Sequence, residues 1–466
     1  MRRRTGKVCR AAFVLLGLGA LHAQPNPVLF EGARLILGTA AAPVENGALL
    51  VQNGRIAAIG ASGSVKAPPG AARVDLTGKT VMPALNNVHI HIGYEGYVSW
   101  SAENHTAANV LDHLEREAFY GVGAAMTMGD QPTDFAIRFQ QDQRAGKFPP
   151  AARFLFSAGF APLGGGPDAL LIQGTSALHA VTEISTPEEA VAAVRKAVAL
   201  KITQLKFWVD NRDNTRGAHK KMPPEVYSAL IAEAHRHGMT VHAHATNLED
   251  QKGVVKAGVD VLVHTLTAEK VDDEFLALLR EKKPYWAPVM GLGDRSELCD
   301  GAVPFIEQVM PDSVVADIRA GKTWLPSPPC AAPATPQFAQ REENLRYNFP
   351  KYLAAGARLV LSTDAGVSQK YSYGFAEHHE LGMYIRLGMT PADAIVDSTS
   401  RPAEVLGLTD SGSLAKGKRA DFIVLNANPL DAIQNTRAID SVYLSGVKLD
   451  RAALQSRFKQ AAVLRK

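Results

Sequence analysis

The run Val81-Met82-Pro83-Ala84-Leu85-Asn86-Asn87-Val88-His89-Ile90-His91 sets the frame for the whole chain. It is largely apolar and ends in two histidines, a pattern that predicts a buried strand. Side chains alternate across a strand, so His89 and His91 project to the same side. Two imidazoles on one face at a strand end make half of a metal site. A lone His-x-His is more often an ordinary polar strand end, so a metal site requires further ligands elsewhere in the chain.

Strand-like and helical stretches alternate after this run, as far as about residue 407. Helix starts carry their usual signals: Thr186-Pro187-Glu188-Glu189 places a capping residue, a first-turn proline and two acids ahead of an alanine-rich run. The strand candidates are 81–91, 122–128, 153–158, 203–209, 239–244, 259–264, 284–290 and 358–364. Eight strands separated by helical stretches predict a (β/α)8 TIM barrel.

Short β-rich runs flank the predicted barrel on both sides. Between residues 28 and 78 they are separated by tight turns, among which Asn53-Gly54 is a hairpin signal. Similar runs return near the C-terminus, at 420–425 and 441–444. We therefore expect an α/β protein made of two parts. These are a barrel over residues 82–407 and one small β-sandwich in which segments 24–81 and 408–466 meet.

Residues 1–23 are predicted to be a secretory signal peptide. Five cationic residues precede an apolar run from Ala11 to Leu21. After this run, Leu21-His22-Ala23 resembles a cleavage site. The apolar run is too short to span a bilayer. Cleavage after Ala23 would remove those five cations and no acidic residue, so the formal charge would fall from +4 to −1. We expect a periplasmic or secreted protein with no nucleic-acid partner and, after cleavage, no membrane association.

Two cysteines, Cys299 and Cys330, remain after the predicted cleavage. Both lie in a long connection after the seventh strand, and export implies an oxidising compartment. We expect a disulfide that closes this connection. The length of 466 residues and the hydrophobic share of 46% suit one large domain with a smaller attachment. They leave the oligomeric state open, a homo-oligomer included.

Histidines and a carboxylate follow the ends of the predicted strands, where a barrel of this type builds its site. In chain order the candidates are His89, His91, Lys206, His242, His244, His264 and Asp364. Imidazole nitrogens and carboxylate oxygens that converge from separate strands suit one or two borderline divalent ions, zinc above all. The pattern thus predicts a metal site at the C-terminal face of the barrel.

With these residues the chain resembles the amidohydrolase superfamily, in particular its periplasmic or secreted branch related to imidazolonepropionase and the metal-dependent dipeptidases. The resemblance covers about the whole mature chain. It includes a closing stretch that is similar to the family's passage from the last barrel helix back into the sandwich. That stretch is Arg401-Pro402-Ala403-Glu404-Val405-Leu406-Gly407-Leu408, followed by Gly412-Ser413-Leu414, Gly417-Lys418 and Ala420-Asp421.

The resemblance implies two divalent metal ions, expected to be Zn²⁺, with a ligand set for each. The ligands of the more buried ion would be His89, His91 and Asp364, and those of the second ion would be His242 and His264. His244 faces the same side as His242, so either histidine could be the ligand. The family pattern favours His242 and leaves His244 to contact the substrate or the ligands.

Lys206 and Asp364 would carry the chemistry that the resemblance implies. Lys206 would be carboxylated by CO2 and bridge the two ions, because a free ammonium cannot ligate a metal whereas a carbamate offers two anionic oxygens. The alternative for Lys206 is a salt-bridged barrel lysine. Asp364 would act as the general acid and base.

Two positions of the first strand depart from the family. The common form has glycine after the proline and aspartate two residues before the first histidine, where this chain has Ala84 and Asn87. Asn87 cannot be a charged partner of the metal ligands, which puts the fine tuning of the first metal in doubt.

The connection after the fourth strand is dense in cations between Arg212 and Lys221. It leaves the same barrel face as Lys206, so it should border the pocket. Arg212 is nearest to the strand end and its guanidinium matches a carboxylate, whereas the alternative is a solvated loop. Aromatic side chains near other strand ends could hold an apolar group; they are Trp208, Trp286 and Tyr94. These residues suggest a substrate with a free carboxylate and a bulky apolar group.

The sequence therefore predicts a metal-dependent hydrolase of a carbon–nitrogen bond in a small molecule, such as an N-acyl amino acid, a dipeptide or a cyclic amide. Two other enzymes on the same barrel are alternatives, a lactone or ester hydrolase and a mononuclear deaminase. A deaminase would need a glutamate soon after a histidine of the fifth or sixth strand, where this chain has Ala245 and Thr265 to Thr267. A non-catalytic binding protein that kept the fold is the third possibility.

Overall fold

The computed structural model describes residues 27–461, apart from 98, 164–165, 167–176, 210–219, 295–302, 323–334 and 368–370. Three of the predictions above fall outside the described residues. They concern the signal peptide, Arg212, and the pairing of Cys299 with Cys330. They stay predictions.

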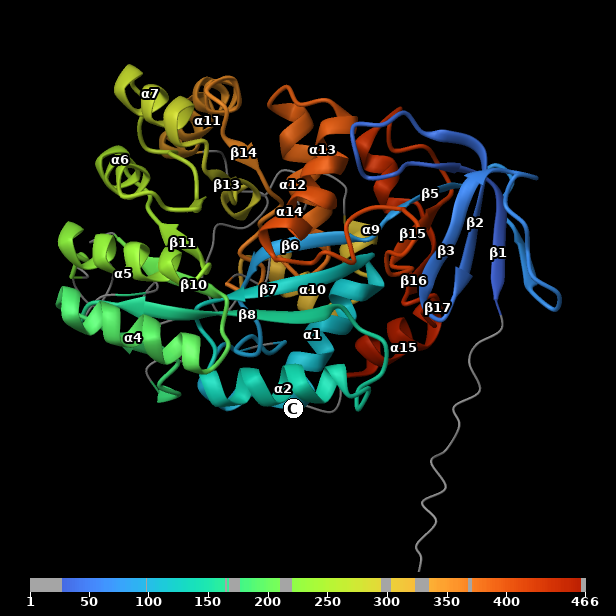
Figure 1. The fold of residues 1–466 in the computed structure, drawn as a ribbon, viewed down its shortest axis with the longest axis horizontal. Helices are drawn as coiled ribbons and strands as arrows, with labels where there is room; N and C mark the ends of the chain where they lie inside the picture. The colour runs from blue at the N-terminus through green and yellow to red at the C-terminus, as the bar shows by residue number, and fades with distance from the viewer. Residues whose placement is uncertain are drawn as a thin grey trace, which may run out of the picture.

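Eight parallel strands follow one another around the barrel in chain order (Figure 1). They are β6 (Leu85–Ile90), β7 (Val122–Met128), β8 (Arg153–Ala161), β10 (Gln204–Trp208), β11 (Thr240–His244), β12 (Val261–Val263), β13 (Tyr285–Ala287) and β14 (Arg358–Leu359). The barrel closes where Val88 N donates to Leu361 O at 2.9 Å and His91 N donates to Ala365 O at 2.7 Å. A short strand, β9 (Val181–Glu183), pairs with the end of β8. The predicted TIM barrel is confirmed.

Helices surround this sheet, and many of them connect its strands (Figure 1). They are α1 (Ala107–Phe119), α2 (Thr133–Arg144), α4 (Pro187–Ala199), α5 (Pro224–Arg236), α6 (Leu248–Lys256), α7 (Asp273–Lys282), α9 (Val303–Ile306), α10 (Asp312–Arg319), α11 (Pro336–Ala354), α12 (Phe375–Arg386), α13 (Pro391–Ser398), α14 (Ser400–Val405) and α15 (Arg451–Ala461). The predicted start of α4 is a capping box, in which Thr186 Oγ1 accepts from Glu189 N at 3.2 Å and the Glu189 carboxylate accepts from Thr186 N. None of the described helices combines the length and the apolar character needed to cross a membrane.

The two ends of the chain meet in a second sheet, at the right of Figure 1. Its order is β17-β16-β15-β5-β1-β2-β3, with β4 (Ala72–Asp75) beside β1. The other strands are β1 (Val28–Leu35), β2 (Val44–Gln52), β3 (Arg55–Ala61), β5 (Thr80–Pro83), β15 (Phe422–Leu425), β16 (Ile439–Leu444) and β17 (Val447–Lys448). Phe30, Phe422 and Tyr443 join both ends in one core, with ring centroids 4.6–5.3 Å apart. Asn53 and Gly54 form the predicted hairpin turn, with φ of 52° and 72°.

The run from Val81 to His91 is two strands rather than the single predicted one. β5 ends at Pro83 and pairs with β1 and β15 of the second sheet, whereas β6 begins at Leu85 and pairs with β7 of the barrel. Proline has no N–H to continue a ladder, and Ala84 N is bound instead by Asp421 O at 3.0 Å. The chain therefore passes from one sheet to the other at Ala84, six residues before the end of β6.

Candidate metal centre

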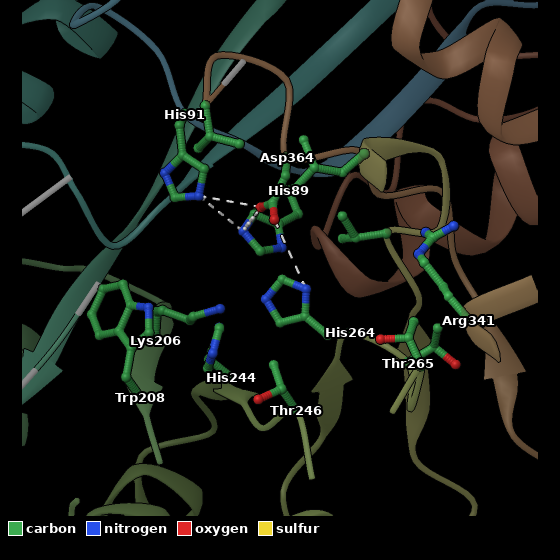
Figure 2. A pocket seen from close by; sticks show the side chains of 14 residues that line it. His89, His91, Lys206, Trp208, His244, Thr246, His264, Thr265, Arg341 and Asp364 are labelled. Carbon is green, nitrogen blue, oxygen red and sulfur yellow. Dashed lines mark hydrogen bonds and ion pairs between the residues drawn. The ribbon is translucent and has the colours of Figure 1, made fainter. Parts of the chain in front are cut away.

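Three buried side chains converge where β6 and β14 reach the C-terminal face of the barrel (Figure 2). His89 Nε2 lies 3.2 Å from His91 Nε2, and Asp364 Oδ1 lies 2.7 Å from the first nitrogen and 3.3 Å from the second. One ligand atom from each residue lies within 4.8 Å of the others. All three side chains are buried. The sequence prediction that these residues come together is confirmed.

The chemistry of this cluster fits a divalent cation. His91 Nδ1 lies 2.8 Å from Asp130 Oδ2, so in the neutral ring the Nδ1–H donates to that carboxylate and Nε2 presents its lone pair to the cluster. His89 Nδ1 is buried and makes no hydrogen bond with any described residue, and the buried Asp364 Oδ1 faces the two histidine nitrogens at 2.7 and 3.3 Å. Lone pairs that face one another at such distances repel unless a cation lies between them, and buried polar atoms without partners are rare.

The pKa shifts of the three residues also favour a cation at the cluster. Burial lowers the pKa of His89 to about 3, because the Asp364 carboxylate offsets only part of that effect. Burial also lowers the pKa of His91, but the carboxylates of Asp130 and Asp364 outweigh it and raise that pKa to about 9. Burial raises the pKa of Asp364, yet the surrounding histidines hold it well below its usual range. The acid is therefore an anion ready to ligate a cation.

Three residues with a strained backbone lie at the cavity. Asp364 has φ of 59°, His264 has φ of 74°, and the β-branched Val289 has φ of 50°. Non-glycine residues seldom occupy this left-handed region, and such strain is typical of functional sites. These turns follow β12, β13 and β14 and aim the three side chains into one cavity.

The cluster forms the floor of a cavity of about 250 Å³. Most of the residues that line it come from the ends of barrel strands or the loops that follow them. Besides the cluster, the full lining consists of Lys206, Trp208, His244, Thr246, His264, Thr265, Thr267, Val289, Leu292, Arg341 and Val367. Figure 2 shows Lys206 and His264 pointing toward the cluster from below.

His244, and not His242, reaches this cavity. The rings of His244 and His264 have centroids 4.4 Å apart, and His264 Nδ1 lies 3.8 Å from Asp364 Oδ2. His242 is fully buried, and its Nε2 lies 2.8 Å from Gln204 Oε1. Alternate residues of β11 face the same way but at successive depths along the barrel, so His242 lies one layer below the cavity. The structure therefore places His244 at the cavity, where the resemblance to the family favoured His242.

Lys206 lies on β10, between β8 and β11, and only 1% of its surface is exposed. A glycine makes room for it: a Cβ at Gly129 would approach Lys206 Cβ and Cγ to 2.9 Å. Lys206 Nζ lies 5.5 Å from the ring centroid of Trp208, on the side of the cavity occupied by His244. The predicted juxtaposition of Lys206 with the histidines is thus present.

Two of the predicted substrate contacts, Tyr94 and Trp286, do not line the cavity. The Tyr94 hydroxyl donates to Asp130 O at 2.5 Å, and its ring stacks on Trp100. Trp286 lies beside Leu262 and Leu359 in the sheet and stacks on Tyr352 of α11, with centroids 4.3 Å apart. It therefore faces the helices, whereas its neighbour Ala287 faces the barrel interior with Val263. Of the predicted aromatic contacts, Trp208 lies at the cavity.

Asp130 and Arg341 are site residues that the sequence reasoning missed. Asp130 follows the end of β7, so applying the strand-end rule to the second strand would have identified it. Arg341 lies on α11 and is far in sequence from the end of any barrel strand, so the strand-end rule could not have identified it. Asn87, whose lack of charge was noted, accepts from His89 N at 2.9 Å and donates to Glu377 Oε1 at 2.5 Å. The family usually has an aspartate at the position of Asn87. In this chain the carboxylate that contacts this position comes instead from Glu377 of α12.

Comparisons with known proteins show the family and the fold of the chain. The model of the amidohydrolase family matches residues 80–449. An imidazolonepropionase of Deinococcus radiodurans is 39% identical over 101 residues, which are 20% of this chain and 24% of that protein. One from Geobacillus sp. (strain WCH70) is 23% identical over 82% of this chain and 84% of its own. The first match thus spans about a quarter of its relative's length.

A solved Xaa-Pro dipeptidase with bound methionine has the same fold, with a TM-score of 0.68 and 23% identity over 91% of this chain and 100% of its own. The family model covers well over half of the chain and includes every candidate metal ligand. Its members are generally metal-dependent hydrolases of carbon–nitrogen bonds. The chain belongs to the amidohydrolase family.

Proposed function

We propose that this protein is a metal-dependent hydrolase that cleaves an amide bond in an N-acyl amino acid, a dipeptide or a cyclic amide. The observation that carries the proposal is the convergence of His89, His91 and Asp364 at the floor of a cavity that Lys206 and His264 also line. The family match supports the reaction class. The predicted signal peptide supports a periplasmic or secreted location.

The position of each side chain at the cavity suggests which metal ion it would bind. His89, His91 and Asp364 would hold the more buried ion, and His244 and His264 would hold a second. Lys206, as a carbamate, would bridge the two, since it lies on β10 at the same cavity and its side chain points toward these groups. When bound, two divalent ions such as Zn²⁺ would polarise the amide carbonyl and activate a water for attack.

Asp364 would manage the protons of the reaction. Its carboxylate lies at the cavity floor and is ionised, because the neighbouring histidines hold its pKa well below the usual range although burial opposes them. It would accept the proton of the attacking water and deliver it to the leaving nitrogen. An amine is a poor leaving group unless it is protonated, so this transfer is the step that an amide substrate requires.

The remaining walls would hold the substrate. Trp208, Val289, Leu292 and Val367 offer apolar surface to a bulky side chain. The hydroxyl of Thr246 lies on the side of Lys206 and Trp208 (Figure 2). This mixed lining suits an amide that carries both an apolar group and a polar end.

Metal analysis combined with an activity screen tests the proposal. Purified protein with zinc added should contain two ions per chain and should hydrolyse members of a panel of N-acyl amino acids and dipeptides. His91→Ala should lose both metal and activity. A protein that holds one ion and releases ammonia from nucleobases would be a deaminase, and one that cleaves lactones in preference to amides would be an esterase-type enzyme. A protein that binds no metal and turns over none of these substrates would be a binding protein.

A further inference from the structure

We propose that Arg341 binds a carboxylate of the substrate and so restricts the enzyme to amides that carry a free acid. This inference rests on the proposed amide hydrolysis, and it assigns to the described pocket a role that the sequence had assigned to Arg212. Arg341 and Lys206 are the arginine and the lysine among the described residues that line the cavity. With Lys206 turned into an anion as a carbamate, Arg341 would be the remaining cation of this pair.

The guanidinium of Arg341 is held in place by the protein. Arg341 lies in the second turn of α11, and one Nη donates to Met290 O in the loop after β13. The other Nη lies 3.3 Å from Glu342 Oε1. Two contacts cannot use the five N–H donors of a guanidinium. A fixed fork with donors to spare is the arrangement that binds a carboxylate in bidentate fashion.

The carboxylates nearest to Arg341 are shared with a second arginine. Glu342 is shared, because its second oxygen lies 3.1 Å from Arg386 Nη2, and the nearby Asp294 lies 3.2 Å from the same atom. The Arg341 side chain is only 17% exposed. Burial lowers the pKa of Arg341 even though Glu342, Asp294 and Glu380 oppose that effect. A buried cation that shares its carboxylate with a second arginine gains from an anionic ligand.

The position of Arg341 also orients the substrate. In Figure 2 Arg341 lies beside Thr265, across the cavity from Lys206 and Trp208. In that view the cluster of His89, His91 and Asp364 lies above, with Lys206 and Trp208 on one side of it and Arg341 on the other. A substrate amide at the cluster could therefore place its carboxylate toward Arg341 and its apolar group toward Trp208. Amino acids acylated on nitrogen, and dipeptides, have this order of groups.

A purely structural role is the competing explanation. Arg341 ties α11 to the loop after β13 through Met290 O, and loss of that tie could disturb the cavity as a whole. Such a defect would weaken every ligand alike and would lower the melting temperature. Recognition of a carboxylate would instead weaken acids alone. The two roles are separable with a pair of ligands that differ only in charge.

The test measures binding by calorimetry on the zinc-loaded protein. The probes are N-methylsulfonyl-L-phenylalanine and N-methylsulfonyl-L-phenylalaninol, which share a shape, differ in the carboxylate and contain no amide to hydrolyse. We expect the wild type to bind the acid more tightly than the alcohol. Arg341→Gln should weaken binding of the acid by about 10- to 100-fold, because a charged hydrogen bond is lost. It should leave the affinity for the alcohol within about twofold of the wild-type value. Arg341→Lys should lose part of the preference.

Arg386→Gln is the matched control, because it removes the neighbouring arginine from the same carboxylates without touching the cavity lining. It should keep the preference for the acid. The inference is overturned if the wild type fails to prefer the acid, if Arg341→Gln retains the preference, or if it weakens both probes equally. Because neither probe is a substrate, these results stand whatever the activity screen shows. A failed screen would in turn remove the proposed hydrolysis and leave the carboxylate site intact.

Discussion

His91 Nδ1 and Asp130 Oδ2 lie 2.8 Å apart, and this contact links the ends of the first two barrel strands. Asp130 is itself held by Thr127 Oγ1 at 2.5 Å. The carboxylate thereby fixes which nitrogen of His91 faces the metal cluster. The orientation of a ligand on β6 is thus determined by a residue that follows β7.

Asp130→Asn should weaken metal binding without removing a ligand. The amide cannot hold the imidazole with a charged hydrogen bond, so we expect about a 10- to 100-fold loss of affinity for zinc, as is usual for such partners. Competition with a chelator measures it. Asp134→Asn, an exposed acid in the first turn of α2, is the control and should leave the affinity unchanged. Equal affinities for Asp130→Asn and wild type would show that this contact does not tune the site.

Asp364→Asn should separate metal binding from proton transfer. Asparagine keeps the shape and an oxygen ligand but cannot accept a proton, so kcat should fall by about 10²- to 10⁴-fold. Metal content, measured by elemental analysis, should stay close to that of the wild type. Near-normal turnover would remove Asp364 from the chemical step.

Lys206→Ala should lower metal content and activity together, because a bridging carbamate would be lost. Formate or acetate, which can replace its two oxygens, should restore part of the activity. The rescue distinguishes a bridging carbamate from a buried ammonium, which a carboxylate would not replace. Full metal occupancy in Lys206→Ala would mean that this side chain is not a ligand.

Alanine variants of His244 and His242 should differ in kind. His244 lines the cavity beside His264, so His244→Ala should reduce zinc from two ions to one per chain. His242 lies a layer deeper and binds Gln204, so His242→Ala should lower the melting temperature and retain two ions. Elemental analysis and thermal unfolding of both variants measure this. Loss of one ion in His242→Ala alone would restore the family-based assignment.

Glu117 and Glu377, both fully buried, predict a pH dependence of stability. Burial raises the pKa of Glu117 well above its usual value, and the negative charge of Glu377 raises it further. Burial also raises the pKa of Glu377, to about 6, although Asn87 opposes it. The folded state thus holds these protons more tightly than the unfolded state. Stability should therefore fall as pH rises from about 4.5 through the folded-state pKa values.

Glu117→Gln removes one charge of this pair and should flatten the decline. The variant should melt at a higher temperature than the wild type at pH 8, and the two should differ little at pH 4.5. Glu281→Gln, at an exposed acid of α7, is the control and should follow the wild type. A variant less stable than the wild type at pH 8 would contradict the prediction.

The sequence alone determined the order of the barrel strands, the meeting of the two chain ends, and the strand-end positions of His89, His91, Lys206, His264 and Asp364. These follow from local rules. Apolar runs mark strands, side chains alternate along them, and consecutive parallel strands end at one face of a barrel. Such rules hold whatever the rest of the chain does, so one sequence is enough to apply them.

Tertiary structure decided what depends on depth and on distant segments. His242 and His244 share a face, and only the stagger of β11 against its neighbours puts His244 at the level of the cavity. Trp286 was assigned to the wrong side because the face of a three-residue strand is fixed by its pairing. Arg341 enters the cavity from a helix far along the chain. No local pattern records that approach, because it depends on how α11 packs against the loop after β13.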